Sequence, residues 1–288
     1  MIAKIAVLIT CHNRRNKTIS CLHKLFKQKG IFIDYDIEVF LTDDASTDGT
    51  GHAVKELFPY VNIVSGNGHL YWNRGMHLAW TTAIQANIHY DYYLWLNDDT
   101  DLISEAIIVM LATENHHKDK SLVCGSVRSA ITGEYTYGCR FENGKKIIPN
   151  GQIQECFTIN GNCVLVSKKL VYEIGILDPV YPHAISDLDY GLRALYANFK
   201  VITPAVYVGY CESNEIGPKW WYSSTPIIER FKTLYSPLGN SHPYYFFLFE
   251  KRYFGLFTSI KHYFSIHLRA LLPSLWKKKM LSDFKINQ

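Results

Sequence analysis

Short apolar runs rich in β-branched residues alternate with helical patterns over the first half of the chain. The runs predict strands at 4–10, 37–42, 61–65, 92–96 and 122–127. The patterns between them predict helices at 17–27, 49–57, 72–87 and 104–114. This alternation is typical of βαβ units that build a mostly parallel sheet. We therefore expect an α/β fold whose polar loops meet at the carboxyl edge of the sheet, where ligands of such folds bind.

The second half of the chain has shorter and less regular elements. It predicts hairpin pieces at 135–141 and 146–148, then has an apolar run at 163–166, and predicts helices at 167–174 and 186–197 and a strand at 201–208. Aromatic, basic helices are predicted from about residue 226 onward. The expected organisation is one domain at 1–215, with halves at 1–130 and 131–215, followed by a helical extension at 216–288.

The composition is that of a globular protein. Hydrophobic residues make up 48% and charged residues 19% of the 288 residues, which is enough apolar material for an ordinary core. The seven cysteines are scattered singly without a C-x-x-C pair, so neither a disulfide framework nor a zinc knuckle is indicated. The first ten residues lack the features of a signal peptide, and no run of eighteen uncharged apolar residues occurs. A cytoplasmic protein with reduced cysteines is expected.

The charge is unevenly distributed along the chain. The net charge is +4, but the segment from Tyr244 to the end holds eight basic and two acidic residues, which leaves the rest at −2. Aromatic residues are interleaved with these basic ones, beginning with the run Tyr244–Phe249. Such helices suit the interface of an anionic membrane, so peripheral contact with the inner face of the cytoplasmic membrane is one expectation. Packing on the first domain and a homodimer contact are the alternatives. No nucleic-acid recognition motif accompanies the tail.

Two carboxylates follow the buried strand 92–96. Asp98 and Asp99 would repel each other at the end of this strand unless a cation lay between them, and a hard divalent ion such as Mg²⁺ or Mn²⁺ suits their oxygen atoms. The alternative is that Asp99 or Thr100 caps the helix that follows.

A second acidic loop, 43–49, follows the strand 37–42. Asp43 or Asp44 could accept the imide N–H of a pyrimidine base, and both precede the start of the next helix. The alternative reading is turn and capping chemistry, which Ser46 or Asp48 is well suited to provide.

Three segments in order, 5–14, 41–50 and 96–99, resemble the family 2 glycosyltransferases. The segments 160–163, 175–179 and 186–193 resemble the rest of that family's catalytic domain, so the resemblance covers about residues 3 to 210. It implies a GT-A fold, with a Rossmann-like nucleotide-binding sheet and a smaller acceptor-side sheet. It also implies a nucleotide-sugar donor, a divalent metal and inversion at the anomeric carbon.

The resemblance assigns roles to individual residues. The residues that it places in or beside the nucleotide pocket are Thr10, Asn13, Arg14, Asp43 and Asp44. Asp99 becomes the principal metal ligand, assisted by Asp98, which also lines the donor site. The segment 66–75 resembles the donor-lining segment of rhamnosyltransferase-like members, in which Gly68 would allow close backbone approach and Arg74 would face phosphate. Core packing is the alternative for Tyr71 and Trp72 in this segment.

Asp187 falls where the family places its general base. Asp189, two residues later, is expected to cap the helix or to pair with Arg193 instead. The match departs from the family at Ser186 and Asn97, where acidic residues are usual. A Q-x-x-R-W run, typical of processive synthases, is absent, so a single transfer is favoured.

The predicted function is therefore transfer of one sugar, from dTDP-rhamnose or a UDP-hexose, to an acceptor hydroxyl. The resemblance suggests a saccharide acceptor, lipid-linked or free, in bacterial surface polysaccharide (O-antigen or capsule) synthesis. A sugar nucleotidyltransferase is disfavoured because the loop at 10–15 is not rich in glycine, and a dinucleotide dehydrogenase because no G-x-G-x-x-G follows the first strand. A carbohydrate-binding protein that has lost turnover stays an alternative.

Overall fold

The computed structural model describes residues 2–116, 120–213, 217–239 and 241–276. The chain divides into two compact units: unit 1 is Met1–Pro179 with Ser186–Ser213, and unit 2 is Val180–Ile185 with Asn214–Gln288. The predicted boundary between residues 215 and 216 lies outside the described residues, as do the lysines at 277–279 and 285 of the basic C-terminal segment.

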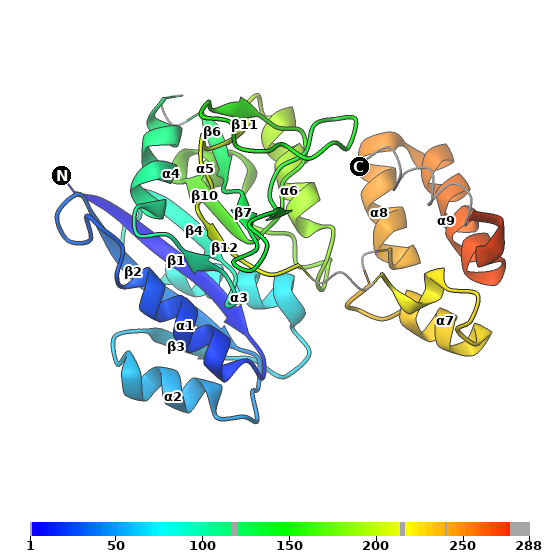
Figure 1. The fold of residues 1–288 in the computed structure, drawn as a ribbon, viewed down its shortest axis with the longest axis horizontal. Helices are drawn as coiled ribbons and strands as arrows, with labels where there is room; N and C mark the ends of the chain where they lie inside the picture. The colour runs from blue at the N-terminus through cyan, green and yellow to red at the C-terminus, as the bar shows by residue number, and fades with distance from the viewer. Residues whose placement is uncertain (1, 117–119, 214–216, 240, 277–288) are drawn as a thin grey trace. The chain divides into compact units, whose positions relative to one another are not determined.

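Unit 1 is built on one large sheet, seen in Figure 1. Its strands are β1 (Ala3–Cys11), β2 (Tyr35–Asp43), β3 (Asn62–Ser65), β4 (Tyr92–Leu96), β6 (Ser121–Cys124), β9 (Gln154–Glu155), β10 (Cys163–Ser167) and β11 (Lys200–Thr203). They lie in the order β3-β2-β1-β4-β10-β6-β11-β9, and only β10 and β9 run against the others. The predicted α/β fold with a mostly parallel sheet is confirmed.

Unit 1 also contains a smaller sheet, whose hydrogen-bonded strands lie in the order β5-β12-β7-β8. Its strands are β5 (Asp101–Leu102), β7 (Val127–Arg128), β8 (Tyr135–Tyr137) and β12 (Gly209–Tyr210). The predicted strand 122–127 is divided between the two sheets at Gly125, whose missing Cβ would lie 2.4 Å from Val208. The predicted strand 201–208 was too long: β11 ends at Thr203, because Pro204 has no N–H to continue the ladder.

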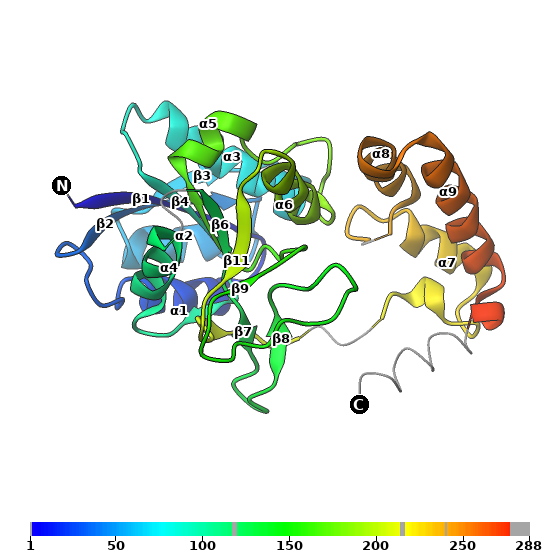
Figure 2. The same ribbon diagram turned by 90° about the horizontal axis from the view of Figure 1, so that it is seen from above.

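Helices cover both faces of the large sheet, as Figure 2 shows. They are α1 (Arg15–Leu25), α2 (Thr50–Leu57), α3 (Tyr71–Gln85), α4 (Ala106–Asn115), α5 (Lys168–Ile174) and α6 (Ser186–Tyr196). Side chains of a strand alternate between faces, so Ile5, Val7 and Ile9 of β1 pack with α1, α2 and α4, whereas Ala6 and Leu8 pack with α3, α5 and α6. Both faces are apolar, which is why β1 and β4 read as unbroken hydrophobic runs.

Unit 2 is helical within its described residues. It holds η1 (Lys219–Trp221), α7 (Ile227–Leu234), α8 (Pro243–Phe254), α9 (Leu256–Leu271) and η2 (Pro273–Trp276). A small core of Trp220, Leu234, Ile266 and Ala270 joins η1, α7 and α9. None of the helices in the described part of the chain is long and apolar enough to cross a membrane. The seven cysteines, all in unit 1, are free and buried.

Helix α3 lies unusually close to the sheet at Gly75. Its carbonyl accepts a hydrogen bond of 2.8 Å from the Thr42 hydroxyl of β2. A Cβ at Gly75 would lie 2.2 Å from Oγ1 and 2.9 Å from Cβ of Thr10, which is closer than any real contact. The glycine therefore sets how closely the segment 66–75 approaches the end of β1.

We predict that Gly75→Ala lowers the free energy of unfolding by about 1–3 kcal/mol, because the new methyl group forces α3 away from Thr10. Urea denaturation measures this, with Gln85→Ala at an exposed position of the same helix as the control; the control should change stability by less than about 0.5 kcal/mol. Equal stability of the two variants would contradict the close packing.

Candidate active site

The polar loops that follow β1, β2 and β4 meet at one edge of the large sheet. β1 lies between β2 and β4 and runs parallel to both, with Cys11 opposite Asp43 at the carboxyl end. Because the three strands end at the same edge, the loops at 10–15, 43–49 and 97–100 become neighbours in space. Hydrogen bonds join the loop 10–15 to the loop 43–49 and to the loop 97–100.

Two carboxylates and two cationic side chains form the centre of this edge. Arg14 Nη1 lies 2.7 Å from Asp98 Oδ1 and 3.0 Å from Asp99 Oδ2, and so bridges the two carboxylates. Lys17 Nζ lies 3.7 Å from Asp99 Oδ2. The Thr18 hydroxyl donates to the second oxygen of Asp98 at 3.4 Å. In this arrangement the cation that separates Asp98 from Asp99 is Arg14, so charge repulsion alone does not require a metal ion there.

The chemistry of this cluster still suits a divalent metal. Carboxylate oxygens are the ligands that Mg²⁺ and Mn²⁺ prefer, and Asp99 keeps 15% of its side chain exposed. Over the described ranges, no three side chains of His, Cys, Asp or Glu are grouped to hold a metal ion. An ion bound by Asp98 and Asp99 would therefore draw its other oxygens from water and from a bound phosphate group. This is the usual way in which Mg²⁺ is held beside a nucleotide.

Asp98 is the most deeply buried member of the cluster, with 3% of its surface exposed. Burial raises the pKa of Asp98 to about 6, although the nearby Arg14 guanidinium acts in the opposite direction. The charged form is thus held at neutral pH largely by one cation. A change at Arg14 would leave a buried carboxylate without its main partner.

Asp44 organises the loop between β3 and α3. Its Oδ1 accepts from the Gly68 amide at 2.7 Å, and its Oδ2 accepts from the amides of Leu70 and Tyr71 at 2.9 and 3.1 Å. Gly68 has φ of +85° and Tyr71 has φ of +58°, so the carboxylate stabilises a backbone path that is otherwise unfavourable. Asp44 thereby shapes the segment 66–71, while its predicted contact with a pyrimidine stays a prediction.

Asn13 joins the first and second loops. Its side-chain Oδ1 accepts from the backbone amides of Thr47 and Asp48 at 2.7 and 3.3 Å. The backbone amide of Asn13 donates to the Ser46 hydroxyl at 2.9 Å. Asp43 closes the same turn, since its Oδ1 accepts from the Ser46 amide at 3.0 Å. Part of the predicted pocket thus consists of residues that fix the loops on which a base would rest.

Arg74 lies at the start of α3 and holds a different segment. Its Nε donates to the Pro179 carbonyl at 2.9 Å, beside Asn73 Nδ2, which donates to the Asp178 carbonyl at 2.7 Å. These bonds tie α3 to the segment that precedes α6. The structure therefore gives Arg74 a positioning contact, and its predicted contact with phosphate stays a prediction.

Asp187 is the second residue of α6 (Ser186–Tyr196) and accepts hydrogen bonds from two backbone amides. Its Oδ2 accepts from Gly161 at 3.2 Å and its Oδ1 from Leu188 at 2.9 Å. Burial raises the pKa of Asp187, and the two amide hydrogen bonds only partly offset this. Asp189, which is fully buried, instead forms the expected ion pair with Arg193 at 2.9 Å, and this is a structural role.

A continuous set of contacts joins Asp187 to the carboxylate cluster. Gly161 lies against the ring of Trp72, where a Cβ would come within 2.5 Å. Trp72 Nε1 donates to Asn97 Oδ1 at 2.6 Å, and Asn97 directly precedes Asp98. Trp72 therefore has both a packing and a polar role at this position.

A second path leads from the same segment to Asp99. Asn162 Nδ2 donates to Thr100 Oγ1 and to Cys211 Sγ, both at 3.3 Å, and the Cys211 thiol lies 3.8 Å from Asp99 Oδ1. The segment 160–162 thus connects the predicted base with the predicted metal ligands.

Sequence reasoning missed Lys17, Thr18 and Cys211 as members of this site. Lys17 and Thr18 follow Arg14 at spacings of three and four, so the first turn of α1 points all three toward the carboxylates. That spacing was available in the sequence. Cys211 directly follows β12 and is more than a hundred residues from Asp99 in sequence. No local pattern identifies it as a member of the site.

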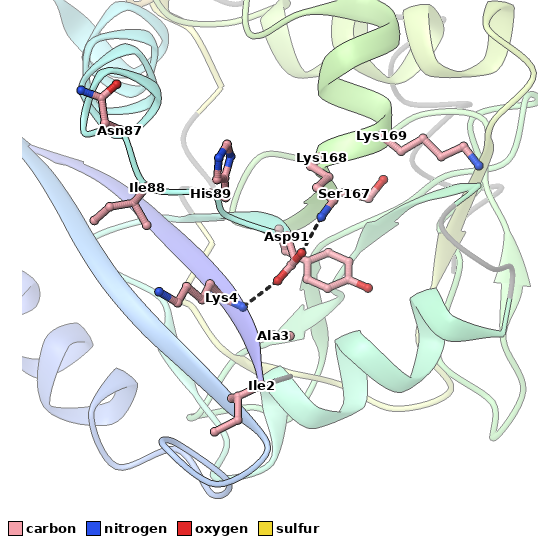
Figure 3. A pocket seen from close by; sticks show the side chains of 11 residues that line it. Ile2, Ala3, Lys4, Asn87, Ile88, His89, Asp91, Ser167, Lys168 and Lys169 are labelled. Carbon is pink, nitrogen blue, oxygen red and sulfur yellow. Dashed lines mark hydrogen bonds and ion pairs between the residues drawn. The ribbon is translucent and has the colours of Figure 1, made fainter.

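One pocket of about 840 Å³ lies elsewhere, at the amino ends of β1 and β4 (Figure 3). Asp91 in this pocket accepts from the Lys4 amide at 3.1 Å and pairs with Lys168 Nζ at 2.7 Å. Because the polar loops lie at the carboxyl ends of the strands, this pocket is separate from the candidate site.

Comparison with known proteins identifies the class of the chain. Residues 6–175 match the family described as "Glycosyl transferase family 2". The chain belongs to this family, and it is a glycosyltransferase. No curated protein matches it by sequence.

Solved structures of glycosyltransferases share the fold. S. aureus TarS 1–349, in complex with UDP-GlcNAc, matches with a TM-score of 0.53 and 14% identity over 80% of this chain. The match spans 64%, or less than two thirds, of that solved chain. The mannosyltransferase PcManGT from Pyrobaculum calidifontis, in complex with GDP-Man and Mn²⁺, matches with a TM-score of 0.58 and 16% identity, over 96% of this chain and 72% of that one. These likenesses confirm the predicted GT-A fold.

We predict a pH-dependent contribution of Asp98 to stability. Its pKa in the folded protein is raised above the unfolded value, so its contribution is most favourable below about pH 4 and is lost as the pH rises through about 6. The difference in unfolding free energy, wild type minus Asp98→Asn, should therefore fall by up to about 3 kcal/mol between pH 4 and pH 8. Urea melts at several pH values measure it, and parallel profiles would contradict the raised pKa.

Proposed function

We propose that this glycosyltransferase moves a single sugar from a nucleotide diphosphate donor to an acceptor hydroxyl, with inversion and with the help of a divalent metal. The observation that carries the proposal is the contact path from Asp187, through Gly161 and Trp72, to the carboxylates Asp98 and Asp99. Through these contacts the proposed base and the proposed diphosphate site would be connected by neighbouring residues of unit 1. Inverting transfer needs both, on opposite sides of the reacting carbon.

On the donor side, Asp99 and Asp98 would hold Mg²⁺ or Mn²⁺. The ion supplies positive charge that stabilises the diphosphate as it leaves. Arg14 and Lys17 already face these carboxylates, and both carry donors suited to phosphate oxygens. Mn²⁺ is present with GDP-Man in the structure of PcManGT, which supports the same arrangement here.

The nucleotide would rest on the loops that Asn13 and Asp44 fix. Asn13 holds the loop 46–48, and Asp44 holds the loop 68–71, so the walls of the pocket are formed before the donor arrives. Each carboxylate oxygen has two lone pairs, so Asp43 and Asp44 keep acceptor capacity for the imide of a pyrimidine. We therefore propose dTDP-rhamnose or a UDP-hexose as the donor. Thr10, near the end of β1, is the remaining residue of the proposed nucleotide pocket.

On the acceptor side, Asp187 would take the proton of the attacking hydroxyl. Its raised pKa makes the carboxylate a stronger base, and the amides of Gly161 and Leu188 fix its orientation. The family resemblance leads us to expect an acid at the position of Ser186, so desolvation rather than a neighbouring carboxylate would raise the basicity of Asp187. A surface polysaccharide precursor in the cytoplasm, free or lipid-linked, is the proposed acceptor.

We predict that a pyrimidine diphosphate raises the melting temperature in the presence of Mn²⁺ and not in EDTA. The reason is that ligands bound only by the folded state stabilise it. Scanning fluorimetry against UDP, dTDP, GDP and ADP measures this. Asp99→Asn should abolish the Mn²⁺-dependent shift, whereas Asp101→Asn, whose carboxylate accepts from the Ser20 hydroxyl at 3.1 Å, should retain it.

No shift with any of the four nucleotides at millimolar concentration would count against a donor site and favour the carbohydrate-binding alternative. An equal shift in EDTA would leave donor binding in place and remove the metal from the proposal.

We predict that Asp187→Asn lowers the rate of sugar transfer or of donor hydrolysis by about 10²–10⁴-fold while donor binding is retained, because a general base is lost and the donor loops are unchanged. Release of nucleoside diphosphate from the preferred sugar nucleotide measures the rate. Glu173→Gln, an exposed residue of α5, is the control. An unchanged rate would exclude Asp187 as the base.

A further inference from the structure

The outer face of α9 carries a stripe of apolar side chains. Phe257 is 83% and Phe264 is 67% exposed, and Ile260, Leu268 and Leu271 are also exposed. At about 100° per residue these five positions fall within an arc of roughly 80°. Such a stripe would normally face the interior of a protein.

The inner face of α9 is already used for packing. Ser259, Ile266 and Ala270 lie on the opposite side of the helix and are buried, and Ile266 and Ala270 belong to the core with Trp220 and Leu234. Arg230 of α7 donates to the Ala270 carbonyl at 2.6 Å, which fixes the end of the helix. The exposed stripe is therefore a second apolar face, which the core of unit 2 does not need.

The charged residues in the described part of unit 2 are mostly basic. The described residues of unit 2 from Gly217 onward contain seven Lys and Arg residues against two Glu residues. α9 contains none of the acidic ones. Glu229 lies 4.0 Å from Lys219, and Glu250 is buried and pairs with His262, so both carboxylates already have a basic partner.

We propose that this face of α9 is a surface for binding an anionic lipid membrane in the plane of its interface. Apolar side chains on one face, with Lys261 beside them, match the layered structure of such a membrane: anionic headgroups above acyl chains. A second copy of the chain fits less well, because it would bring two positively charged faces together. The sequence from 277 to 288 adds four lysines against one aspartate.

Co-sedimentation of the full chain with vesicles tests this proposal. Vesicles of phosphatidylcholine with phosphatidylglycerol should bind the protein, and vesicles of phosphatidylcholine alone should bind it at least about tenfold more weakly. About 0.5 M salt should weaken binding to the anionic vesicles, because the Debye length becomes short. Lys261→Glu should weaken it in the same way.

The double variant Phe257→Ser with Phe264→Ser should reduce binding by about tenfold or more, since membrane affinity follows the buried apolar area. Both side chains are largely exposed, so the melting temperature should stay near that of the wild type. Ile131→Ser, at a position of unit 1 that is 84% exposed, is the matched control and should bind as the wild type does.

Absence of binding to anionic vesicles would overturn the proposal, as would equal binding to both kinds of vesicle. A loss of self-association in the double variant, measured by sedimentation, without any effect on vesicles would assign the face to a homodimer instead. Donor binding in solution is measured without vesicles, so its outcome is independent of this one.

Discussion

The bridge that Arg14 makes between Asp98 and Asp99 is the interaction on which the rest of the site depends. Two carboxylates at the end of a buried strand are unfavourable without a cation, and burial makes Asp98 especially costly to ionise. Arg14 and Lys17 relieve this cost from the first turn of α1. The same positive charge is suited to a diphosphate, so in the proposed function the same residues would serve both stability and donor binding.

Much of the polar chemistry at the carboxyl edge serves to hold loops in place. Asp44 and Asn13 each accept hydrogen bonds from several backbone amides, and Gly68 and Tyr71, two of the residues whose amides Asp44 holds, have positive φ. Loops that are fixed before the donor binds lose less entropy when it does. Residues that look like direct ligands in the sequence can therefore contribute by organising the backbone around the ligand.

The sequence indicated the fold class and the positions of the loops with little ambiguity. The run 92–96 is apolar throughout because β4 is covered on both faces, and the acidic loops come directly after strands. These are local properties, which a periodic pattern records. The ends of strands were less well predicted. The predicted strand 201–208 ends early, before Pro204, and the predicted strand 122–127 is divided at Gly125 between the large and the small sheet.

What the sequence determined by itself was the class of residue at each strand end, and hence the family and the candidate carboxylates. Only the tertiary structure decided their partners. The structure shows that Arg14, which is predicted to line the nucleotide pocket, bridges Asp98 and Asp99, and that Cys211 lies near Asp99 although the two are more than a hundred residues apart in sequence. Partner choice depends on sheet order and on helix packing, which are non-local. A pattern along the chain cannot encode a distance between two side chains that only folding brings together.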